Sequence, residues 1–413
     1  MDTEMNTITA LPVSTNVPQA QTACARPIAV LLYSTDFLPG VGGAQQAVAR
    51  LAQGLLATGN QATVVTRTSA GTFDDRDLTY RVVRNPGFTH LWRLMGEADI
   101  VHLAGPAFIP LMIGLLRRKK IVIEHHGYQA ICPNGLLLYS PRQDACPGHF
   151  LAGQYGECVR CVATTNSPAN SWTSAIWQLL IMLPRNWMCR RVSANAAISR
   201  HVERRLQLPR SRTVYYGVPD LLGEAIPPLP ASFAPPCFGF VGRLVEEKGL
   251  TVLLDAASRI RKRGFDFRLK FIGDGPERAR LEELVLKNGL RSQVVFTGSL
   301  NGEAFRRATA DVAAVIMPSI AEETAGLAAI EQMMRGRLVI ASDIGGLGEV
   351  VGETGLKFSA GNAEQLASCM ERVLQEPGIV NEIGAKARQR TLKLFGEARM
   401  VEEHLDLYRE VIG

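Results

Sequence analysis

The sequence predicts an α/β protein made of two doubly wound domains that face a central cleft. Short apolar runs, which are typical of buried parallel strands, alternate with segments of helical periodicity on both sides of a proline-rich stretch. This alternation favours a parallel sheet with helices on both faces in each half of the chain. A length of 413 residues is also too great for one ordinary core and suits two such domains.

The first half of the chain predicts a Rossmann-like domain over residues 27–220. An apolar run at 28–33 precedes a glycine-rich loop and a helical pattern that ends at Gly59. We predict the other strands of this domain at residues 62–66, 99–103, 120–124 and 196–199.

The second half repeats the pattern after a stiff segment at 221–236, which contains five prolines and predicts an interdomain linker. A second domain is expected over 237–395, and a helix over 396–413 that packs back on the first domain. Residues 1–26 are polar and predict a disordered tail. Strands of the second domain are expected at 238–241, 269–272, 294–296, 312–316 and 338–341.

The net charge and the length of the apolar runs limit the classes of protein to which this chain can belong. The net charge is +6, and the basic residues form no dense stripe, so the sequence indicates no nucleic-acid partner. The beginning of the chain does not read as a secretory signal, and no apolar run reaches the roughly 20 residues that span a bilayer. We therefore expect a cytoplasmic protein whose eight cysteines are thiols or metal ligands rather than disulfides.

The strongest motif runs over residues 318–331, where a predicted strand ends and a helix begins. The backbone N–H groups near Gly326 and Leu327 are expected to face the cleft, and a helix N-terminus with such groups attracts a diphosphate. Glu323 precedes this helix and Glu331 lies about two turns along it, so one carboxylate can reach sugar hydroxyls and the other a ribose. Two glutamates at this spacing also occur by chance on many helices.

A second motif places two cations at the same edge of the sheet. Arg243 and Lys248 follow the first strand of the second domain, within residues 240–249. An arginine fork and a lysine ammonium together can offset the charge of a leaving diphosphate, as Mg²⁺ does elsewhere. We therefore expect no metal ion in catalysis.

Residues 240–353 resemble the nucleotide-sugar domain of the family 4 retaining glycosyltransferases, which have the GT-B fold. The resemblance rests on the Arg-x4-Lys pair, the Glu-x7-Glu pair and the glycine-containing sequences at 273–277, 295–298 and 342–349. Weaker similarity extends over most of residues 27–395.

The resemblance implies specific roles for the residues of both motifs. Glu323 would bind the donor sugar beside the reacting carbon as a catalytic residue, and Glu331 would bind the ribose. A glycine loop from the first domain would close over the diphosphate. The donor-binding residues expected on these grounds are Gly42, Gly43, Arg243, Lys248, Gly326, Leu327 and Glu331.

His126 is the catalytic candidate of the first domain, because it follows the strand at 120–124 and so lies at the cleft. It matches a family histidine in position and could hydrogen-bond the donor sugar or the acceptor. A buried histidine with only a structural hydrogen bond is the alternative, and that role is expected for His125. Tyr216 departs from the family pattern, which has asparagine there.

Four cysteines fall in an insertion at about residues 130–165, which resembles a cysteine-bearing insertion in a subset of these transferases. Cys158 and Cys161 form a Cys-x2-Cys pair that fits one edge of a tetrahedral thiolate site, and Cys132 and Cys146 could complete it. A structural zinc ion, free thiols and an iron–sulfur cluster remain alternatives at this point. His149 could replace one ligand.

Residues 172–191 carry an apolar stripe with three tryptophans, followed by Arg190 and Arg191. Such a stripe could lie in a membrane interface. It could equally cover the core or the cysteine region.

The sequence thus predicts a retaining hexosyltransferase that moves a sugar from a nucleotide-diphosphate donor, UDP- or GDP-linked, to an acceptor hydroxyl. We expect a glycan or lipid-linked acceptor in cell-surface polysaccharide or glycolipid biosynthesis, with peripheral contact at the inner face of the membrane. The alternatives are an epimerase of the same fold and a transferase that acts on a soluble metabolite. A non-catalytic nucleotide-sugar-binding protein is the rival outside the enzymes.

Overall fold

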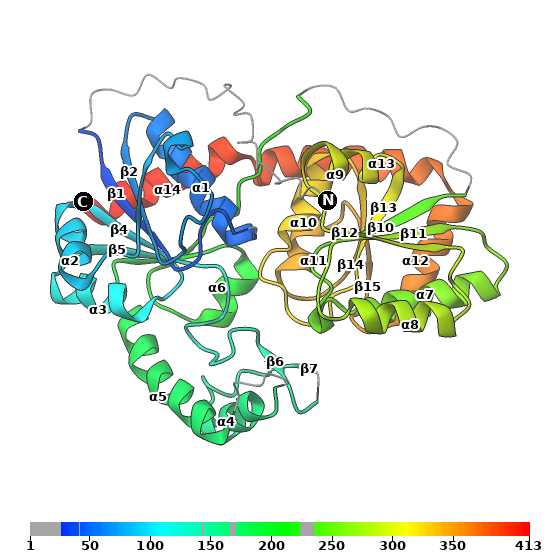
Figure 1. The fold of residues 1–413 in the computed structure, drawn as a ribbon, viewed down its shortest axis with the longest axis horizontal. Coiled ribbons are helices and arrows are strands. Elements are labelled where there is room, and N and C mark those ends of the chain that lie inside the picture. Colours follow the sequence, from blue (N-terminus) through cyan, green and yellow to red (C-terminus); the bar gives the residue numbers. More distant parts are fainter. Residues whose placement is uncertain (1–25, 41, 143, 166–170, 224–234) are drawn as a thin grey trace.

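The structure is a computed structural model that describes residues 26–40, 42–142, 144–165, 171–223 and 235–413. Two α/β domains lie side by side (Figure 1). The predicted disordered tail lies outside the described residues except for Arg26, and so do residues 224–234 of the predicted linker.

The first domain is built on a seven-stranded sheet in which every pairing is parallel. Side chains alternate between its two faces, as the pleat of a strand requires. Leu31 and Tyr33 face α2 (Phe88–Glu97) and α3 (Phe108–Leu116), whereas Val30 and Leu32 face α1 (Gly43–Ala57). The strand order is β3 (Arg81–Arg84), β2 (Gln61–Thr66), β1 (Ala29–Ser34), β4 (Ile100–Ala104), β5 (Lys120–His125), β8 (Ala194–Ala197) and β9 (Ser211–Thr213).

The second domain has a six-stranded sheet, also parallel throughout. Its strand order is β12 (Val294–Gly298), β11 (Arg268–Ile272), β10 (Cys237–Val241), β13 (Val312–Met317), β14 (Leu338–Ser342) and β15 (Leu356–Phe358). Its helices are α7 (Leu250–Lys262), α8 (Arg278–Lys287), α9 (Gly302–Thr309), α10 (Leu327–Met334), α11 (Gly345–Val351), α12 (Ala363–Gln375) and α13 (Gly378–Leu394). The predicted fold class, two doubly wound α/β domains, is confirmed.

In both sheets the strand order reverses beside the first strand, between β1 and β4 and between β10 and β13. Doubly wound sheets bind ligands at the carboxyl ends of the strands at this point. The loops after β10 and β13 are therefore the part of the second domain where a ligand is expected.

The segment between β5 and β8 leaves the first domain and lies below it in Figure 1. It contains a short antiparallel hairpin, β6 (Leu138–Tyr139) and β7 (Asp144–Ala145), followed by α4 (Tyr155–Ala163) and α5 (Trp172–Cys189). Helices α4 and α5 pack on each other. This segment includes the predicted cysteine-bearing insertion.

The C-terminal helix α14 (Glu397–Ile412) lies against α1 of the first domain (Figure 1). The contact is close, because a Cβ atom added at Gly54 of α1 would lie 2.2 Å from a methyl carbon of Val401. The start of the predicted linker is also fixed, since Arg388 of α13 pairs with Asp220 at 2.8 Å. The chain thus passes between the domains at two places. The first is the linker, whose start is held by the Arg388–Asp220 ion pair, and the second leads into α14, which packs on α1.

Candidate functional site

The loops after β10 and β13 form the second domain's side of the site. The first loop contains the short 3-10 helix η2 (Glu246–Lys248). Ile320 in the second loop donates a backbone hydrogen bond of 3.0 Å to the carbonyl oxygen of Glu247. Gly249 has a φ of +62°, and a Cβ atom there would lie 2.1 Å from the carbonyl oxygen of Pro318. Only glycine allows the two loops to approach this closely.

Lys248 and Glu323 lie together between these loops. Their Nζ and Oε1 atoms are 2.9 Å apart, and the hydroxyl of Ser319 also hydrogen-bonds Glu323 Oε1. The Glu323 side chain is only 12% exposed. A buried carboxylate of this kind needs a fixed charged partner. The carboxylate is thus held in one place with a cation beside it.

The N-terminus of α10 lies next to this pair and has no capping side chain. Gly326 precedes the helix with a φ of +71°, so the chain turns sharply there. The first N–H groups of a helix carry a partial positive charge, which favours an anionic group. The sequence predicted this arrangement of Gly326 and Leu327.

The glycine loop of the first domain reaches the same helix. A Cβ atom at Gly43 would lie 2.9 Å from Cδ2 of Leu327. Gly42 is the residue before α1, which begins at Gly43. The structure therefore brings Gly42 and Gly43 to the N-terminus of α10, where glycine allows the approach of the two domains.

Glu331 and Arg243 are placed differently from Lys248 and Glu323. Glu331 pairs across the domain interface with Arg50 of α1, at 3.5 Å, and Arg50 also donates to the carbonyl oxygen of Gly217. Arg243 is 78% exposed and lies 3.9 Å from Glu247. Arg243 is thus an exposed cation at the edge of the site and is not part of the half-buried Lys248–Glu323 pair.

His126 occupies the first domain's side, immediately after β5. Its Nδ1 atom lies 2.5 Å from the hydroxyl of Tyr216, and its Nε2 atom lies 3.3 Å from Glu124 Oε2. The rings of His126 and Tyr216 are stacked, with centroids 5.5 Å apart. Both ring nitrogens therefore face protein groups, and the residue that departs from the family pattern is the one that orients the imidazole.

Glu124 is the centre of a buried network that the sequence reading did not single out. His102, His126 and His404 surround its carboxylate at 3.3, 3.3 and 3.6 Å. Burial alone would raise the pKa of Glu124, but the three imidazoles outweigh it and hold the pKa well below the ordinary value. Tyr408 of α14 completes the network through a 2.8 Å hydrogen bond with His102 Nδ1.

The same network is the one group of metal-ligating side chains that the described residues bring within 4.8 Å of one another, namely His102, Glu124 and His404. All three are buried. The Nδ1 atoms of both histidines already have partners, Tyr408 and the carbonyl oxygen of Met400. The network therefore joins β4, β5 and α14 by hydrogen bonds and charge.

Burial also lowers the pKa of His125 and of His404 to about 4, against the opposing effects of Asn195 and Glu124. His125 lies 2.9 Å from Asn195 Oδ1 inside the domain. This placement matches the structural role expected for it.

Several residues at the domain interface were not singled out from the sequence. Glu349 accepts hydrogen bonds from the backbone N–H groups of Arg200 and His201, at the start of α6 (Arg200–Leu206), and from the Tyr215 hydroxyl. Glu322 pairs with both His201 and Arg205 of the same helix, at 3.2 and 3.0 Å. A glutamate directly before Glu323 was the available signal, but its partner lies in the other domain and no local pattern reveals it.

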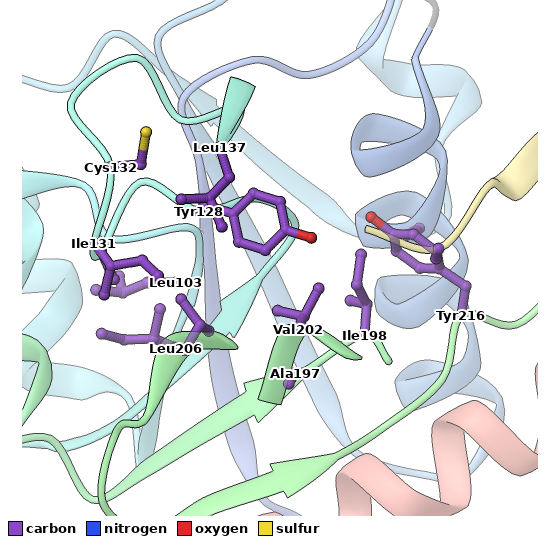
Figure 2. Close-up of a cluster of buried hydrophobic side chains, with 14 of the residues drawn as sticks. Leu103, Tyr128, Ile131, Cys132, Leu137, Ala197, Ile198, Val202, Leu206 and Tyr216 are labelled. Carbon is purple, nitrogen blue, oxygen red and sulfur yellow. The ribbon is translucent and has the colours of Figure 1, made fainter. Parts of the chain in front are cut away.

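Tyr128 is a further buried residue beside the site, within the cluster that Figure 2 shows. Its ring lies among Leu137, Ile198 and Val202, and its hydroxyl has no hydrogen-bond partner in the part of the chain that the structure describes. Burial and the nearby charge of Glu322 raise its pKa. The residue therefore remains a neutral phenol.

All four cysteines of the insertion are buried in the same apolar cluster. Burial and the neighbouring thiols of Cys132, Cys146 and Cys161 raise the pKa of Cys158 to about 12. His149 turns its Nδ1 atom to Gln154 Oε1 at 2.5 Å and packs its ring on Tyr139. The structure thus gathers the four sulfurs and gives His149 other contacts.

Helix α5 exposes the apolar stripe predicted over residues 172–191. Trp172, Trp177 and Trp187 are 61, 65 and 53% exposed, whereas Ala175 and Met182 on the other side are buried. Arg191 lies over the Trp187 ring at 3.6 Å. The core-packing alternative therefore accounts for one side of the helix only. Ile176, Leu180 and Leu183 are exposed with the tryptophans.

The chain has one Asp-x-Asp sequence, at Asp75 and Asp77 in the 3-10 helix η1 (Asp75–Asp77). Arg84 pairs with Asp75 at 2.7 Å. The sequence lies in the first domain, whereas the α10 site belongs to the second. We therefore assign these two aspartates a structural role in the first domain.

Residues 235–376 match the family model described as glycosyl transferases group 1. This segment contains η2, Glu323 and α10, so the match covers the second domain's side of the site.

Curated relatives of the chain are glycosyltransferases, and the chain matches each of them over only part of its length. The chain is 34% identical over 180 residues to the 2-deoxystreptamine glucosyltransferase of Streptomyces kanamyceticus, which is 43% of this chain and 46% of that protein. It is 34% identical over 177 residues to a sulfoquinovosyl transferase of Arabidopsis thaliana, 42% of this chain and 33% of that protein. The matched length is less than half of each relative.

Solved structures match almost the whole chain in fold. A glycosyltransferase of Rickettsia africae has a TM-score of 0.69 at 16% identity and covers 94% of this chain and 99% of its own. The sucrose-phosphate synthase of Thermosynechococcus elongatus has a TM-score of 0.69 at 20% identity and covers 92% and 98%. The two Rossmann-like domains are therefore arranged as in GT-B glycosyltransferases.

Proposed function

We propose that this protein is a retaining, metal-independent glycosyltransferase that moves a hexose from a nucleotide-diphosphate sugar to an acceptor hydroxyl. One observation carries the proposal: the uncapped N-terminus of α10 lies between the Lys248–Glu323 pair and the Gly42–Gly43 loop of the other domain. The family match over residues 235–376 and the activities named for the curated relatives support it.

The proposed step places the diphosphate at the N-terminus of α10, where the free N–H groups and Lys248 offset its charge. Arg243, which is exposed at the edge of the site, turns in to bind it. The bond between the anomeric carbon and the phosphate oxygen breaks as the acceptor oxygen bonds to the same face of that carbon. The acceptor proton passes to the departing phosphate oxygen, so the step requires no protein base. Stabilisation of the leaving group supplies most of the rate enhancement.

Glu323 has a second role once the donor is bound. Its carboxylate is paired with Lys248 and Ser319. When Lys248 binds the diphosphate, its ion pair with Glu323 is lost. The Glu323 carboxylate can then accept hydrogen bonds from the sugar hydroxyls. On the first domain's side, His126 exchanges one of its contacts, with Tyr216 or with Glu124, for a hydrogen bond to the sugar or the acceptor.

The acceptor side is assigned to the first domain. A cavity of about 210 Å³ lies beside the carboxyl ends of β1, β2 and β3 and is lined by Tyr33, Arg67, Asn85, Pro86, Phe88, Leu91 and Ile109. Its mixture of an arginine with apolar side chains suits a lipid-linked acceptor that carries phosphate.

We further propose that α5 lies at the surface of a membrane when the enzyme meets such an acceptor. Its exposed tryptophans and Arg190 and Arg191 are typical of a helix that lies in the lipid headgroup region. Among the described helices, none has both the length and the apolar composition needed to cross a bilayer. The proposed contact is therefore peripheral, at the inner face of the membrane. The activity named for the Streptomyces relative favours a soluble acceptor as the second candidate.

Donor binding is tested by thermal unfolding of the full chain with a panel of UDP-, GDP-, ADP- and dTDP-sugars. A donor at 100 times its Kd is expected to stabilise the protein by about 2.7 kcal/mol. An Anabaena protein of similar fold has been solved in complex with UDP-glucose, which makes that sugar the first choice. Arg243→Ala is expected to lose most of the shift and to keep the melting temperature of the free protein, because Arg243 is exposed.

The control is Arg280→Ala, an exposed arginine on α8 whose partner is Glu277. Equal responses of R243A and the wild type would contradict the assignment of Arg243. No response to any donor in the panel would contradict the proposed function. NMR of the product then separates three reactions: transfer with the α- or β-configuration of the donor kept, transfer with inversion, and epimerisation of the donor without an acceptor.

A further inference from the structure

The insertion between β5 and α5 brings together four cysteines from three separate places. Cys132 follows β5, Cys146 follows the β6–β7 hairpin, and Cys158 and Cys161 lie three residues apart on α4. Their exposed fractions are all between 7 and 9%. None of them forms a disulfide. Three chain segments with little regular structure of their own therefore converge on one group of buried sulfurs.

The two single cysteines are held in turns of the same kind. Cys132 begins a Cys-Pro-Asn-Gly sequence and Cys146 a Cys-Pro-Gly sequence. The glycines of these turns, Gly135 and Gly148, have φ values of +75° and +103°. A positive φ after the proline reverses the chain, so that backbone N–H groups turn back toward the preceding cysteine.

The N–H groups of the glycines in these turns bond back to the cysteines. Gly148 donates its backbone N–H to Cys146 Sγ at 3.5 Å, and Gly135 donates its backbone N–H to the carbonyl oxygen of Cys132 at 3.0 Å. A neutral thiol is a weak acceptor, whereas a thiolate accepts such hydrogen bonds strongly and is the form that binds metals. The Cys146 turn therefore offers an N–H group that a thiolate would accept.

The pair on α4 is connected to the same turns. Cys161 Sγ lies 3.4 Å from the backbone nitrogen of Ser140, after β6, and 3.5 Å from the side-chain nitrogen of Asn134. The Cys132 thiol donates to the amide oxygen of that same Asn134, at 2.8 Å. One small side chain thus touches the sulfur of Cys132 and the sulfur of Cys161. In Figure 2 the Cys132 sulfur points away from Ile131 and Leu206.

We propose that Cys132, Cys146, Cys158 and Cys161 bind one structural Zn²⁺ ion as a tetrahedral four-thiolate site. Two cysteines spaced as Cys-x2-Cys supply one edge, and the two Cys-Pro turns supply the opposite edge. No three of these sulfurs lie within 4.8 Å of one another in the described residues. Sulfurs that share a zinc ion are roughly 3.8 Å apart, which follows from a Zn–S distance of about 2.3 Å. Binding would therefore draw the two turns onto α4.

Such a site explains how the insertion keeps its shape. The hairpin strands β6 and β7 have two residues each, and the loops around them are too long to be fixed by their own hydrogen bonds. Arg205 of α6 donates to the carbonyl oxygen of Cys146 and also pairs with Glu322 at the domain interface. The proposed ion would thus fix the position of Cys146. Through Arg205, this residue is connected to Glu322, which directly precedes Glu323.

Elemental analysis of the purified full-length protein tests the proposal, after dialysis without chelator. We expect about one zinc ion per chain. Cys158→Ser should lose it, whereas Cys369→Ser, which changes a half-buried cysteine of α12 in the other domain, should keep it. The metal content of the wild type decides the question even if C158S fails to fold.

Cobalt provides a second measurement on the wild type. Chelation followed by addition of Co²⁺ should give the intense visible and near-ultraviolet absorption of tetrahedral cobalt–thiolate coordination, and Zn²⁺ should abolish it. Iron in place of zinc, or protein without metal in which all four cysteines react as free thiols, would overturn the proposal. So would a disulfide found among the four by mass spectrometry of the non-reduced protein.

Discussion

The buried carboxylate of Glu124 affects the charge and the hydrogen bonds of the histidines around it. It lies in the core among His102, His126 and His404, and an ionised group at this depth needs polar partners that offset the loss of its hydration. His404 donates its Nδ1 proton to Met400, so the Nε2 atom that faces Glu124 carries no proton while His404 is neutral. The charge of this network therefore changes when His404 gains a proton.

Acid should destabilise this protein through these buried histidines. The pKa of His404 and of His125 is lowered to about 4 by burial, whereas both residues titrate near 6.5 in the unfolded chain. Between these two pH values the unfolded state binds more protons, so the free energy of unfolding falls as the pH falls from about 6.5 to about 4. The low pKa of Glu124 acts in the same direction at still lower pH.

His404→Gln tests this assignment by denaturant unfolding at pH 7 and at pH 5. The variant is expected to be less stable than the wild type at pH 7, because a buried contact is lost, and to lose less further stability at pH 5. His90→Gln on α2, outside the network, serves as the control and should keep the pH dependence of the wild type. An H404Q variant with the same pH dependence as the wild type would show that His404 is not one of the groups responsible.

At the scale of elements, most strands of the two sheets were predictable, including the edge strand β12, but the short edge strands were not. Every predicted strand overlaps an observed one, because strands such as β1, β10 and β13 are apolar runs buried on both faces. The edge strands β3, β9 and β15 have only three or four residues and show no such run. The cysteines were recognisable by spacing, but their approach depends on turns that the sequence leaves open.

The site divides in the same way. The motif around Lys248 and the motif around Glu323 and Gly326 each lie within a single loop of the second domain, so local spacing was enough to find each of them. Glu349, Glu322 and Arg50 act on partners in the other domain, more than a hundred residues away. Long-range pairings of this kind leave no periodic pattern in one sequence.

Helix α5 gives a prediction at the same scale. Trp177 and Leu180 are 65 and 54% exposed, so replacing both with serine should leave the melting temperature nearly unchanged. If α5 lies in the headgroup region, the double variant should bind vesicles of phosphatidylglycerol and phosphatidylcholine at least roughly tenfold more weakly, because the apolar burial that the two side chains lose together is worth more than about 1.4 kcal/mol.

Leu392→Ser, at an exposed leucine of α13, is the matched control and should bind vesicles as the wild type does. Sedimentation of the protein with the vesicles measures the effect. Binding that is unchanged in the double variant, or absent in the wild type at low salt, would contradict the proposed membrane contact.

On the scale of the whole molecule, the two domains are joined by charge at the start of α6 and by a shared apolar core. One buried cluster includes Ile198 and Val202 of the first domain and Ala325 and Leu347 of the second. Glu349 supplies a carboxylate to the free N–H groups of α6, as a capping side chain would, but from the other domain. Closure of the domains and positioning of the residues around Glu323 therefore depend on one another.

Glu349→Ala is expected to loosen this closure without unfolding either sheet. Two backbone N–H groups and the Tyr215 hydroxyl lose their acceptor, at a cost of about 0.5–1.5 kcal/mol for each bond, because these groups are only part-buried or exposed and water can reach them. Small-angle X-ray scattering should show a larger radius of gyration than in the wild type, and the donor sugar should bind more weakly, because the Gly42–Gly43 loop no longer stays beside Leu327. The exposed Glu353→Ala, at the end of the same segment, should change neither quantity. An E349A variant that has the wild-type radius and binds the donor normally would show that the apolar contacts alone hold the domains together.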